Sequence, residues 1–423
     1  MRRKIMETRL ADVSTIYHSA LNLFPYWTNK KLEEWKQAYL DTIKQTLSSD
    51  SLTDFYHLLC QFTARLDDGH TMIYLPKELK EDLVYPIALD MIENQLVIVK
   101  TTNDYQNYLY LPIKRINGLS VSDFLKEITS KFWLSNEVVS LYYYQNYLSF
   151  FQPNQLSVDF FSNDRLELSP QNKETIVWME EKVEKDLVVE TDAITIIKDK
   201  NKILITIKHF LSQDVVTIFY QYMELYKESE VIIFDVRGNM GGNSGLANDI
   251  CSAFFKESFE TELSFYQVLD AQRYASGTQL YYKQDISDDN EFTQTLSHQY
   301  YLEGIDQETV PKNRGELSDK AVIIIQNRQT YSSAENFVMN FYKRPKTRII
   351  GTYSAGSTGQ PALIPLETGG TFMVTAKGVK IPNGKIHHNI GIKPDIMMEE
   401  MLSDKLNGVD SLLNYALQTS IDY

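Results

Sequence analysis

Apolar residues recur every three or four positions along the first part of the chain, up to about residue 70. This period is typical of amphipathic helices. The predicted helices cover residues 12–23, 30–47 and 51–66. Pro25 and the polar run 48–51 separate them. Ser51 and Asp54 have the spacing of a capping box at the start of the third helix.

The pattern changes after the third helix. Residues 65–76 predict a helix end, a glycine turn and a short strand. Short apolar runs then follow one another as far as about residue 189, as in a β-rich region. Residues 96–99 predict one strand, and residues 113–121 predict two strands joined by an Asn-Gly turn. A short helix is predicted over residues 123–132.

Strands and helices alternate from residue 194 onward. Predicted strands cover residues 203–207, 231–234, 322–325 and 348–350, and predicted helices cover residues 214–226, 245–255 and 334–342. Such alternation indicates an α/β fold with a largely parallel sheet. The polar segment 267–312, with an acidic run at 285–291, predicts an inserted loop or lid.

The chain of 423 residues is too long for one small core, which favours two or three domains. We expect an N-terminal helical domain over residues 1–75, a β-rich linking domain over 76–190, and an α/β domain over 191–423. A hydrophobic content of 43% fits a globular protein with substantial cores.

The net charge of −14 argues against nucleic-acid binding, which requires a basic surface. Cys60 and Cys251 lie in helical apolar patterns, so we expect buried free thiols. Residues 1–21 contain no apolar run of the length of a signal peptide or membrane span. We expect a cytoplasmic protein, and a processed exported form stays open.

A glycine-rich turn follows the predicted strand at 231–234. Asp235 and Arg237 come first, then Gly238, Gly241 and Gly242, and a helical pattern begins at Leu246. Free N–H groups at such a turn favour negative charge and can hold a phosphate, a carboxylate or the oxyanion of an acyl-transfer intermediate. The alternative is a plain strand-to-helix turn. We expect Asp235 and Arg237 to form a structural pair that fixes the turn.

Ser332 stands between the predicted strand at 322–325 and the next helix. A serine at this place is most often an ordinary N-cap. A nucleophile there would gain from nearby helix N–H groups, and the amides of Ser333 and Gly241 could hold an oxyanion together. This turn and the glycine turn follow strands of one predicted sheet, and ligand crevices of such sheets lie at the carboxyl ends of the strands.

These segments resemble the C-terminal processing (tail-specific) peptidases and their relatives, the tricorn core protease and the interphotoreceptor retinoid-binding repeats. The matching motifs are at 235–242, 330–335, 350–359 and 391–395, within a similarity over roughly 195–400. The resemblance implies a ClpP/crotonase-like catalytic domain and endopeptidase activity. It assigns the nucleophile to Ser332 rather than Ser333, and the glycine-turn donor to Gly241 or Gly242.

A serine hydroxyl is a weak nucleophile unless a base takes its proton. The best-known branch of the family uses a lysine, but Ser357 occupies that place. The branch that includes the tricorn core has a histidine in a motif similar to residues 66–71, which implies His70 as the base. A histidine has a pKa near working pH, which suits a proton shuttle.

The sequence does not decide which residue is the third catalytic residue, the one that orients His70. The tricorn-like branch has a serine just before the histidine and a glutamate before the Gly-x-x-Pro-Asp motif, whereas this chain has Gly69 and, most nearly, His388. The alternatives are an orienting group at Asp67, Asp68 or His388, or a Ser–His dyad. The pair His387–His388 is a poor metal signal, and we expect no metal and no cofactor.

The leading hypothesis is a serine endopeptidase that cleaves peptides or unfolded protein segments. Ser332 and His70, aided by His388, would be catalytic, with an oxyanion hole from Gly241, Gly242 and Ser333. Two alternatives are a pseudo-protease that binds peptides or hydrophobic ligands, and an acyl-CoA enzyme of crotonase type. The segment 113–121 is similar to PDZ domains, so the β-rich domain is expected to be a degenerate PDZ-like unit. We expect peptide or protein substrates, and the sequence indicates no oligomeric state.

Overall fold

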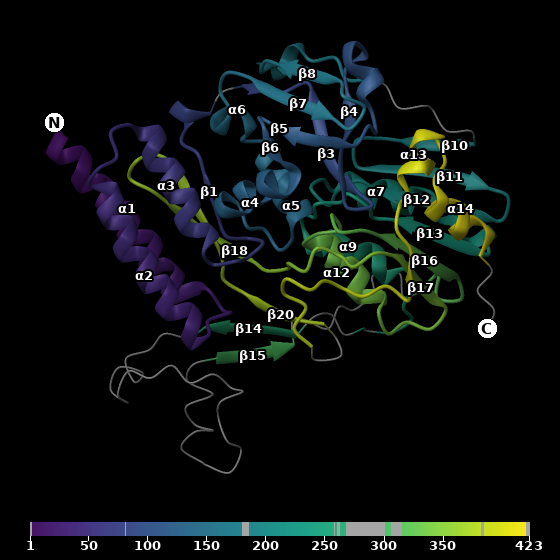
Figure 1. Cartoon of the computed structure of the whole chain (residues 1–423). Helices are drawn as coiled ribbons and strands as arrows, with labels where there is room; N and C mark the ends of the chain where they lie inside the picture. The colour runs from purple at the N-terminus through teal and green to yellow at the C-terminus, as the bar shows by residue number, and fades with distance from the viewer. Residues whose placement is uncertain are drawn as a thin grey trace.

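The computed structural model describes residues 2–80, 82–179, 186–257, 259, 263–267, 301–305, 315–381 and 385–419. Three N-terminal helices stand at one side, a β-rich part lies above, and an α/β part with the central sheet lies opposite the helices (Figure 1). The fold is therefore mixed α/β with a central sheet and helices. Most of the polar insert predicted at 267–312 lies outside the described residues.

A seven-stranded sheet forms the centre of the α/β part, in the order β10-β11-β12-β13-β16-β17-β21. The strands are β10 (Leu187–Glu190), β11 (Ile194–Asp199), β12 (Lys202–Ile207), β13 (Val231–Asp235), β16 (Ala321–Gln326), β17 (Thr347–Gly351) and β21 (Ile396–Met397). Pairing is parallel from β12 to β21 and antiparallel between β10, β11 and β12. The predicted, largely parallel sheet is confirmed.

Strands β13 and β16 are buried along their whole length, because helices cover both faces of this sheet. The helices of this part are α7 (Asp214–Gln221), α8 (Met223–Glu228), α9 (Ser244–Ser252), α12 (Ser333–Phe341), α13 (Leu402–Leu406) and α14 (Ser411–Gln418). Residues of α7, α9 and α12 share one apolar cluster with the sheet. Leu412 and Ala416 of α14 pack on a second cluster formed by the alternate residues of the strands.

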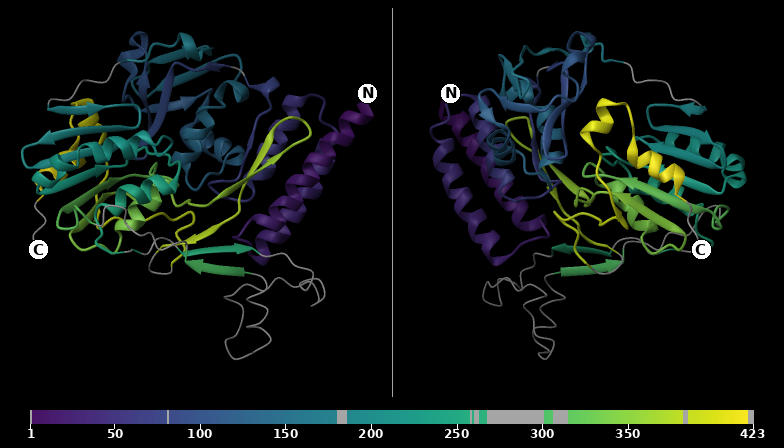
Figure 2. Two further views of the ribbon diagram at one scale, coloured as in Figure 1. Left: turned by 180° about the vertical axis from the view of Figure 1, so that it is seen from behind. Right: turned by 45° about the vertical axis from the view of Figure 1, so that its right-hand side comes forward.

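The N-terminal helices are α1 (Arg2–Leu23), α2 (Asn29–Thr46) and α3 (Leu52–Ala64). The bounds of α2 and α3 are close to those predicted, whereas α1 begins at Arg2 and not at the predicted residue 12. The predicted capping box is confirmed at α3, where Ser51 and Asp54 exchange side-chain-to-backbone hydrogen bonds. A hairpin of β18 (Pro361–Pro365) and β19 (Thr371–Thr375) reaches from the α/β part to these helices, as both views of Figure 2 show. There β19 pairs with β1 (Met72–Tyr74) in antiparallel register.

Asp12 of α1 fixes the tip of this hairpin. Its buried carboxylate accepts hydrogen bonds from the backbone N–H groups of Glu367 and Thr368, and from the hydroxyl of Thr368. The pairing of β1 with β19 and the contact at Asp12 join two segments that are about 300 residues apart in sequence. The N-terminal segment is thereby held against the α/β part.

The β-rich part has three helices, two main antiparallel sheets and one short antiparallel pair of two-residue strands. Its strands are β3 (Ile87–Ile92), β4 (Gln95–Thr101), β5 (Ile113–Ile116), β6 (Leu119–Ser120), β7 (Leu156–Phe160) and β8 (Arg165–Leu168), and its helices are α4 (Val121–Lys131), α5 (Glu137–Gln145) and α6 (Leu148–Phe151). Asn117 and Gly118 both have positive φ, as the predicted Asn-Gly hairpin turn requires. Helices α5 and α6 were not predicted.

Smaller elements complete the described chain. They are β2 (Leu83–Val84), β9 (Gln171–Asn172), β14 (Leu263–Gln267), β15 (Tyr301–Ile305), β20 (Gly378–Lys380) and short 3₁₀ turns at Lys77–Leu79, Asn103–Tyr108 and Lys173–Thr175. One apolar cluster extends from the N-terminal helices through the β-rich part and takes in Tyr331, Ala355 and Phe372. The helices and the β-rich part therefore share a core, and that core reaches the turn that carries Ser332.

Both cysteines are buried and unpaired, as predicted. No helix in the described ranges has the length and apolar character that a membrane crossing requires.

Candidate active site

Ser332 lies at the turn between β16 and α12, at the carboxyl end of a parallel strand. Its backbone has φ 56° and ψ −123°, a region that non-glycine residues rarely adopt. Such a conformation costs about 1–3 kcal/mol and is found where the surroundings impose it, often at functional sites. The Ser332 side chain makes no capping hydrogen bond to α12. The structure therefore does not use Ser332 as an ordinary N-cap.

The Ser332 hydroxyl instead meets the imidazole of His70. Nε2 of His70 lies 3.1 Å from Oγ of Ser332, although 262 residues separate the two in sequence. The Ser332 side chain is partly exposed, whereas His70 is 6% exposed. A nucleophile that substrate can reach is thus paired with a shielded base.

Tyr331 and Asp68 hold His70 in place. The Tyr331 ring stacks on the imidazole at 4.6 Å between centroids and 15° between planes, and its hydroxyl donates to the carbonyl of Gly69. The buried Asp68 carboxylate accepts from the His70 backbone N–H at 3.1 Å and from the hydroxyls of Thr71 and Thr375. These contacts fix the ring and the chain on either side of it.

His388 does not reach the His70 ring. Nε2 of His388 lies 3.0 Å from Oδ1 of Asp68, and its ring stacks on Tyr26 at 3.8 Å. Asp67 is turned to solvent and pairs with Lys31. Among the described residues, none of the three candidates for the orienting group, Asp67, Asp68 and His388, forms a hydrogen bond with the His70 imidazole. Nδ1 of His70 instead lies 2.8 Å from Oγ of Ser357.

The glycine turn lies directly against the nucleophile. A Cβ added to Gly241 would stand 2.7 Å from Cβ of Ser332, and one added to Gly242 would stand 2.2 Å from the carbonyl oxygen of Phe210. Only glycine fits these positive-φ positions without moving the backbone around them. The turn thereby brings the Gly241 backbone beside the Ser332 side chain and the Ser333 amide nitrogen.

The amides of this turn are not equivalent. The N–H of the buried Gly241 donates to Oδ1 of Asn239 at 2.8 Å. The N–H groups of Gly242 and Ser333 have no hydrogen-bond partner within the part of the chain that the structure describes, and Gly242 is exposed. Oγ of Ser333 donates to the carbonyl of Gly242, so these two residues are in contact. Of the three predicted donors, Gly242 and Ser333 are free to bind an oxyanion, and Gly241 is engaged.

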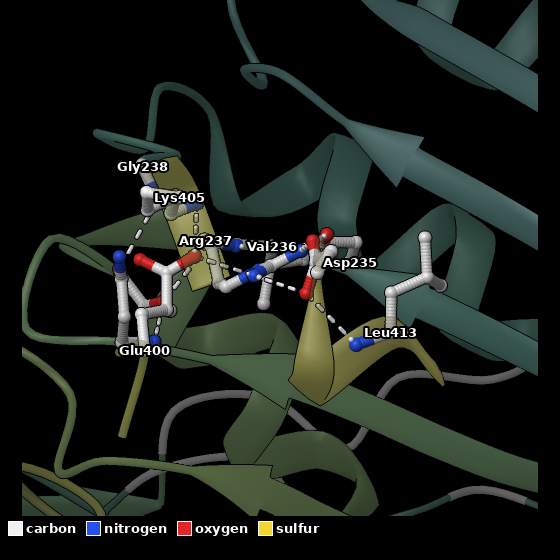
Figure 3. Close-up of polar contacts among 10 residues, drawn as sticks. Asp235, Val236, Arg237, Gly238, Glu400, Lys405 and Leu413 are labelled. Carbon is white, nitrogen blue, oxygen red and sulfur yellow. Dashed lines mark hydrogen bonds and ion pairs between the residues drawn. The ribbon is translucent and has the colours of Figure 1, made fainter. Parts of the chain in front are cut away.

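Arg237 fixes the start of the glycine turn (Figure 3). Its guanidinium pairs with Asp235 at 2.6 Å, Asp410 at 2.6 Å and Glu400 at 2.7 Å. The expected structural pair of Asp235 and Arg237 is therefore confirmed, and two carboxylates from the C-terminal segment extend it. Burial opposes the charge, but the carboxylates of Asp235 and Asp410 raise the pKa of Arg237 well above its ordinary value.

The electrostatics of the site favour a neutral imidazole. Burial lowers the pKa of His70 to about 4; the carboxylate of Asp68 opposes this shift and His388 adds to it. Burial would raise the pKa of Asp68, but the hydrogen bond and charge of His388, with two threonine hydroxyls, bring it to about 2. At neutral pH, His70 can therefore accept a proton from Ser332 while Asp68 remains a carboxylate.

Three features of the site were not predicted from the sequence. Ser357 lies at Nδ1 of His70, Tyr331 stacks on the His70 ring, and Glu335 is buried in the first turn of α12. One sequence feature pointed to Ser357, since it stands where the best-known branch of the family has a lysine.

Burial also lowers the pKa of His387, and its Nε2 lies 3.3 Å from the Thr358 hydroxyl. Across the described ranges, no three His, Cys, Asp or Glu side chains group closely enough to hold a metal ion.

Ser332 lies at a strained strand–helix turn, is hydrogen-bonded to a neutral imidazole and has free amides nearby. This is the arrangement of a serine-hydrolase type of site. Residues 203–398 match the model of Peptidase family S41. Over this segment the chain is similar to C-terminal processing peptidases.

A relative of known name shows the same similarity. The carboxy-terminal-processing protease of Bartonella bacilliformis is 33% identical over 100 residues, which are 23% of this chain and 23% of that protein. The chain thus spans about a quarter of the length of this curated relative.

Two solved structures share the fold. Mature CPAF, solved in complex with lactacystin, has a TM-score of 0.70 at 14% identity, with 98% of this chain and 100% of that chain covered. The photosystem II D1 C-terminal processing protease has a TM-score of 0.51 at 14% identity, with 93% of each chain covered.

The depressed pKa of His70 predicts how reactivity at Ser332 depends on pH. Because the neutral imidazole is the active form, the rate should hold as pH falls through 6.5 and decline only toward about pH 4. The measurement is the second-order rate of inactivation by a fluorophosphonate between pH 3.5 and 8, with circular dichroism at each pH to show that the protein is folded. An inflection at or above pH 6.5 would contradict the assignment.

Replacing Arg237 should destabilise the fold. Arg237→Met would leave Asp235 and Asp410 without the cation that joins them, while Glu400 keeps its ion pair with Lys405. Removing one partner of a buried ion pair costs about 3–5 kcal/mol. Arg348→Met is the matched control, because Arg348 is exposed, and it should change stability by less than about 0.5 kcal/mol. Urea unfolding measures both variants, and equal midpoints would refute the structural role of Arg237.

Proposed function

We propose that this protein is a serine endopeptidase in which Ser332 attacks the scissile carbonyl and His70 is the general base. The observation that carries the proposal is the 3.1 Å contact between Nε2 of His70 and Oγ of the strained Ser332. Neither feature is needed for a helix cap, since the Ser332 side chain makes no capping bond. Both are what an activated nucleophile requires.

The reaction begins when Oγ of Ser332 bonds to the carbonyl carbon and its proton passes to Nε2 of His70. The carbonyl π electrons move to the oxygen, and the N–H groups of Gly242 and Ser333 hold the negative charge. The imidazolium then gives its proton to the leaving amine as the C–N bond breaks, which leaves an acyl-enzyme. A water molecule repeats the sequence with His70 as base and releases the acid.

Peptides and unfolded or C-terminal segments of proteins are the proposed substrates. The named relatives support this class, since two are C-terminal processing proteases. The site also draws on two parts of the chain, with His70 next to the N-terminal helices and Ser332 on the α/β part. A peptide groove between those parts would place the scissile bond at both residues.

We also propose a ClpP/crotonase-like catalytic domain over residues 191–423 and a degenerate PDZ-like unit within residues 76–190. The parallel sheet with helices on both faces supports the first. The four-stranded sheet β6-β5-β7-β8, with α4 following its Asn-Gly hairpin, supports the second. Such units bind peptides by adding a strand. We further propose that residues 1–75 form an N-terminal helical domain.

Removing the nucleophile tests the function. Ser332→Ala should lower the cleavage of casein or of a peptide library by at least about 10³-fold, because the other groups cannot form an acyl-enzyme. Ser130→Ala, on the exposed side of α4, is the matched control and should cleave like the wild type. Product analysis by mass spectrometry measures both variants.

Equal hydrolysis by Ser332→Ala and the wild type would refute the proposal. A wild type that binds peptides but cleaves none would favour the pseudo-protease instead. Gly69 and His388 differ from the serine and glutamate of the tricorn-like branch, which favours that alternative. Against it, the described structure gives His70 a hydrogen-bond partner on each ring nitrogen.

A further inference from the structure

We propose that Ser357 is the positioning residue of this site, and that its hydroxyl takes the place of the carboxylate which commonly orients a catalytic histidine. The inference rests on the proposed function of Ser332 and His70. Oγ of Ser357 lies 2.8 Å from Nδ1 of His70, while Nε2 faces the nucleophile at 3.1 Å. The two ring nitrogens are thus both engaged, one by each serine.

The proposed role of His70 as general base requires one tautomer of its ring. To act as a base, Nε2 must accept the proton of Ser332, so the ring proton must reside on Nδ1. The Ser357 hydroxyl oxygen accepts that N–H, which stabilises the productive tautomer and ring orientation. A hydroxyl carries no charge, so it stabilises the imidazolium less than a carboxylate would, which is consistent with the depressed pKa of His70.

Ser357 also holds the nucleophile. Its carbonyl oxygen accepts a hydrogen bond from the N–H of Ser332 at 3.0 Å. One residue therefore contacts the backbone of the nucleophile and the ring of the base. The relative position of Ser332 and His70, which come from distant parts of the chain, depends on the placement of this one residue.

Gly69 makes room for the Ser357 hydroxyl. A Cβ at position 69 would lie 2.2 Å from Oγ of Ser357 and 2.1 Å from Oγ of Ser135. The serine that the tricorn-like branch has at this place would therefore collide with Ser357. Gly69 and Ser357 form a complementary pair: the chain lacks a side chain before the histidine and supplies a hydroxyl from the opposite loop.

Glu335 fixes the loop that carries Ser357. Its fully buried carboxylate accepts from the N–H groups of Gly356 and Ser357 at 2.8 Å each, and from the hydroxyl of Ser354 at 2.5 Å. Burial raises the pKa of Glu335 to about 7, and these hydrogen bonds oppose the rise. Glu335 lies one turn of α12 after Ser332, so the nucleophile and the Ser357 loop share one anchor.

Ser357→Ala tests the positioning role. Leaving Nδ1–H without an acceptor in a buried site should slow fluorophosphonate inactivation by about 10–100-fold. Ser135→Ala is the matched control: it removes the hydroxyl on the other side of Gly69, which has no hydrogen-bond partner among the described residues, and it should react like the wild type. Thermal melting of each variant shows whether it is folded.

Nitrogen-15 NMR of the His70 ring supplies a readout that a merely structural role would not move. In the wild type we expect the proton on Nδ1, and in Ser357→Ala a mixture of tautomers, with Ser135→Ala unchanged. Wild-type rate and tautomer in Ser357→Ala would overturn the inference. A wild type that is unreactive but keeps the Nδ1–H tautomer, lost in Ser357→Ala, would instead count against the proposed peptidase function while supporting the positioning role.

Discussion

The hydrogen bond between His70 and Ser332 is the interaction on which the account of this protein depends. It exists only because the segment after α3 is held against the α/β part, where β1 pairs with β19. Thr375 at the end of β19 also donates to Asp68, which in turn holds the backbone of His70. A single hairpin thus carries both the strand pairing and the polar contacts that deliver the base to the nucleophile.

Buried charge surrounds this contact, and each charge is matched by hydrogen bonds. Asp68, Glu335 and Arg237 each lie in or beside the site with at least three hydrogen bonds. Buried ionic groups add little net stability to a fold, but removing one member of such a network destabilises the fold strongly. Their consequence here is geometric: they hold the His70 turn, the Ser357 loop and the glycine turn in one arrangement around a strained serine.

The patterns that are local in sequence predicted the fold well. The runs at 203–207, 231–234 and 322–325 are continuous and apolar, and they became the buried strands β12, β13 and β16. Helices α5 and α6 were missed because their short, tyrosine-rich segment has no clear helical period. In the site, motif and resemblance led to Ser332 and His70. Ser357 was missed because its role depends on a loop that approaches His70 from 287 positions away, and no local pattern records such a contact.

Fluorophosphonate labelling followed by peptide mass spectrometry tests the central claim most directly, because it reports which hydroxyl is activated and requires no knowledge of the substrate. The account predicts one phosphonate adduct per chain, on Ser332, and a strong loss of labelling in His70→Gln with the fold retained. An adduct on Ser333, or labelling of Ser332 that is as fast in His70→Gln as in the wild type, would contradict it.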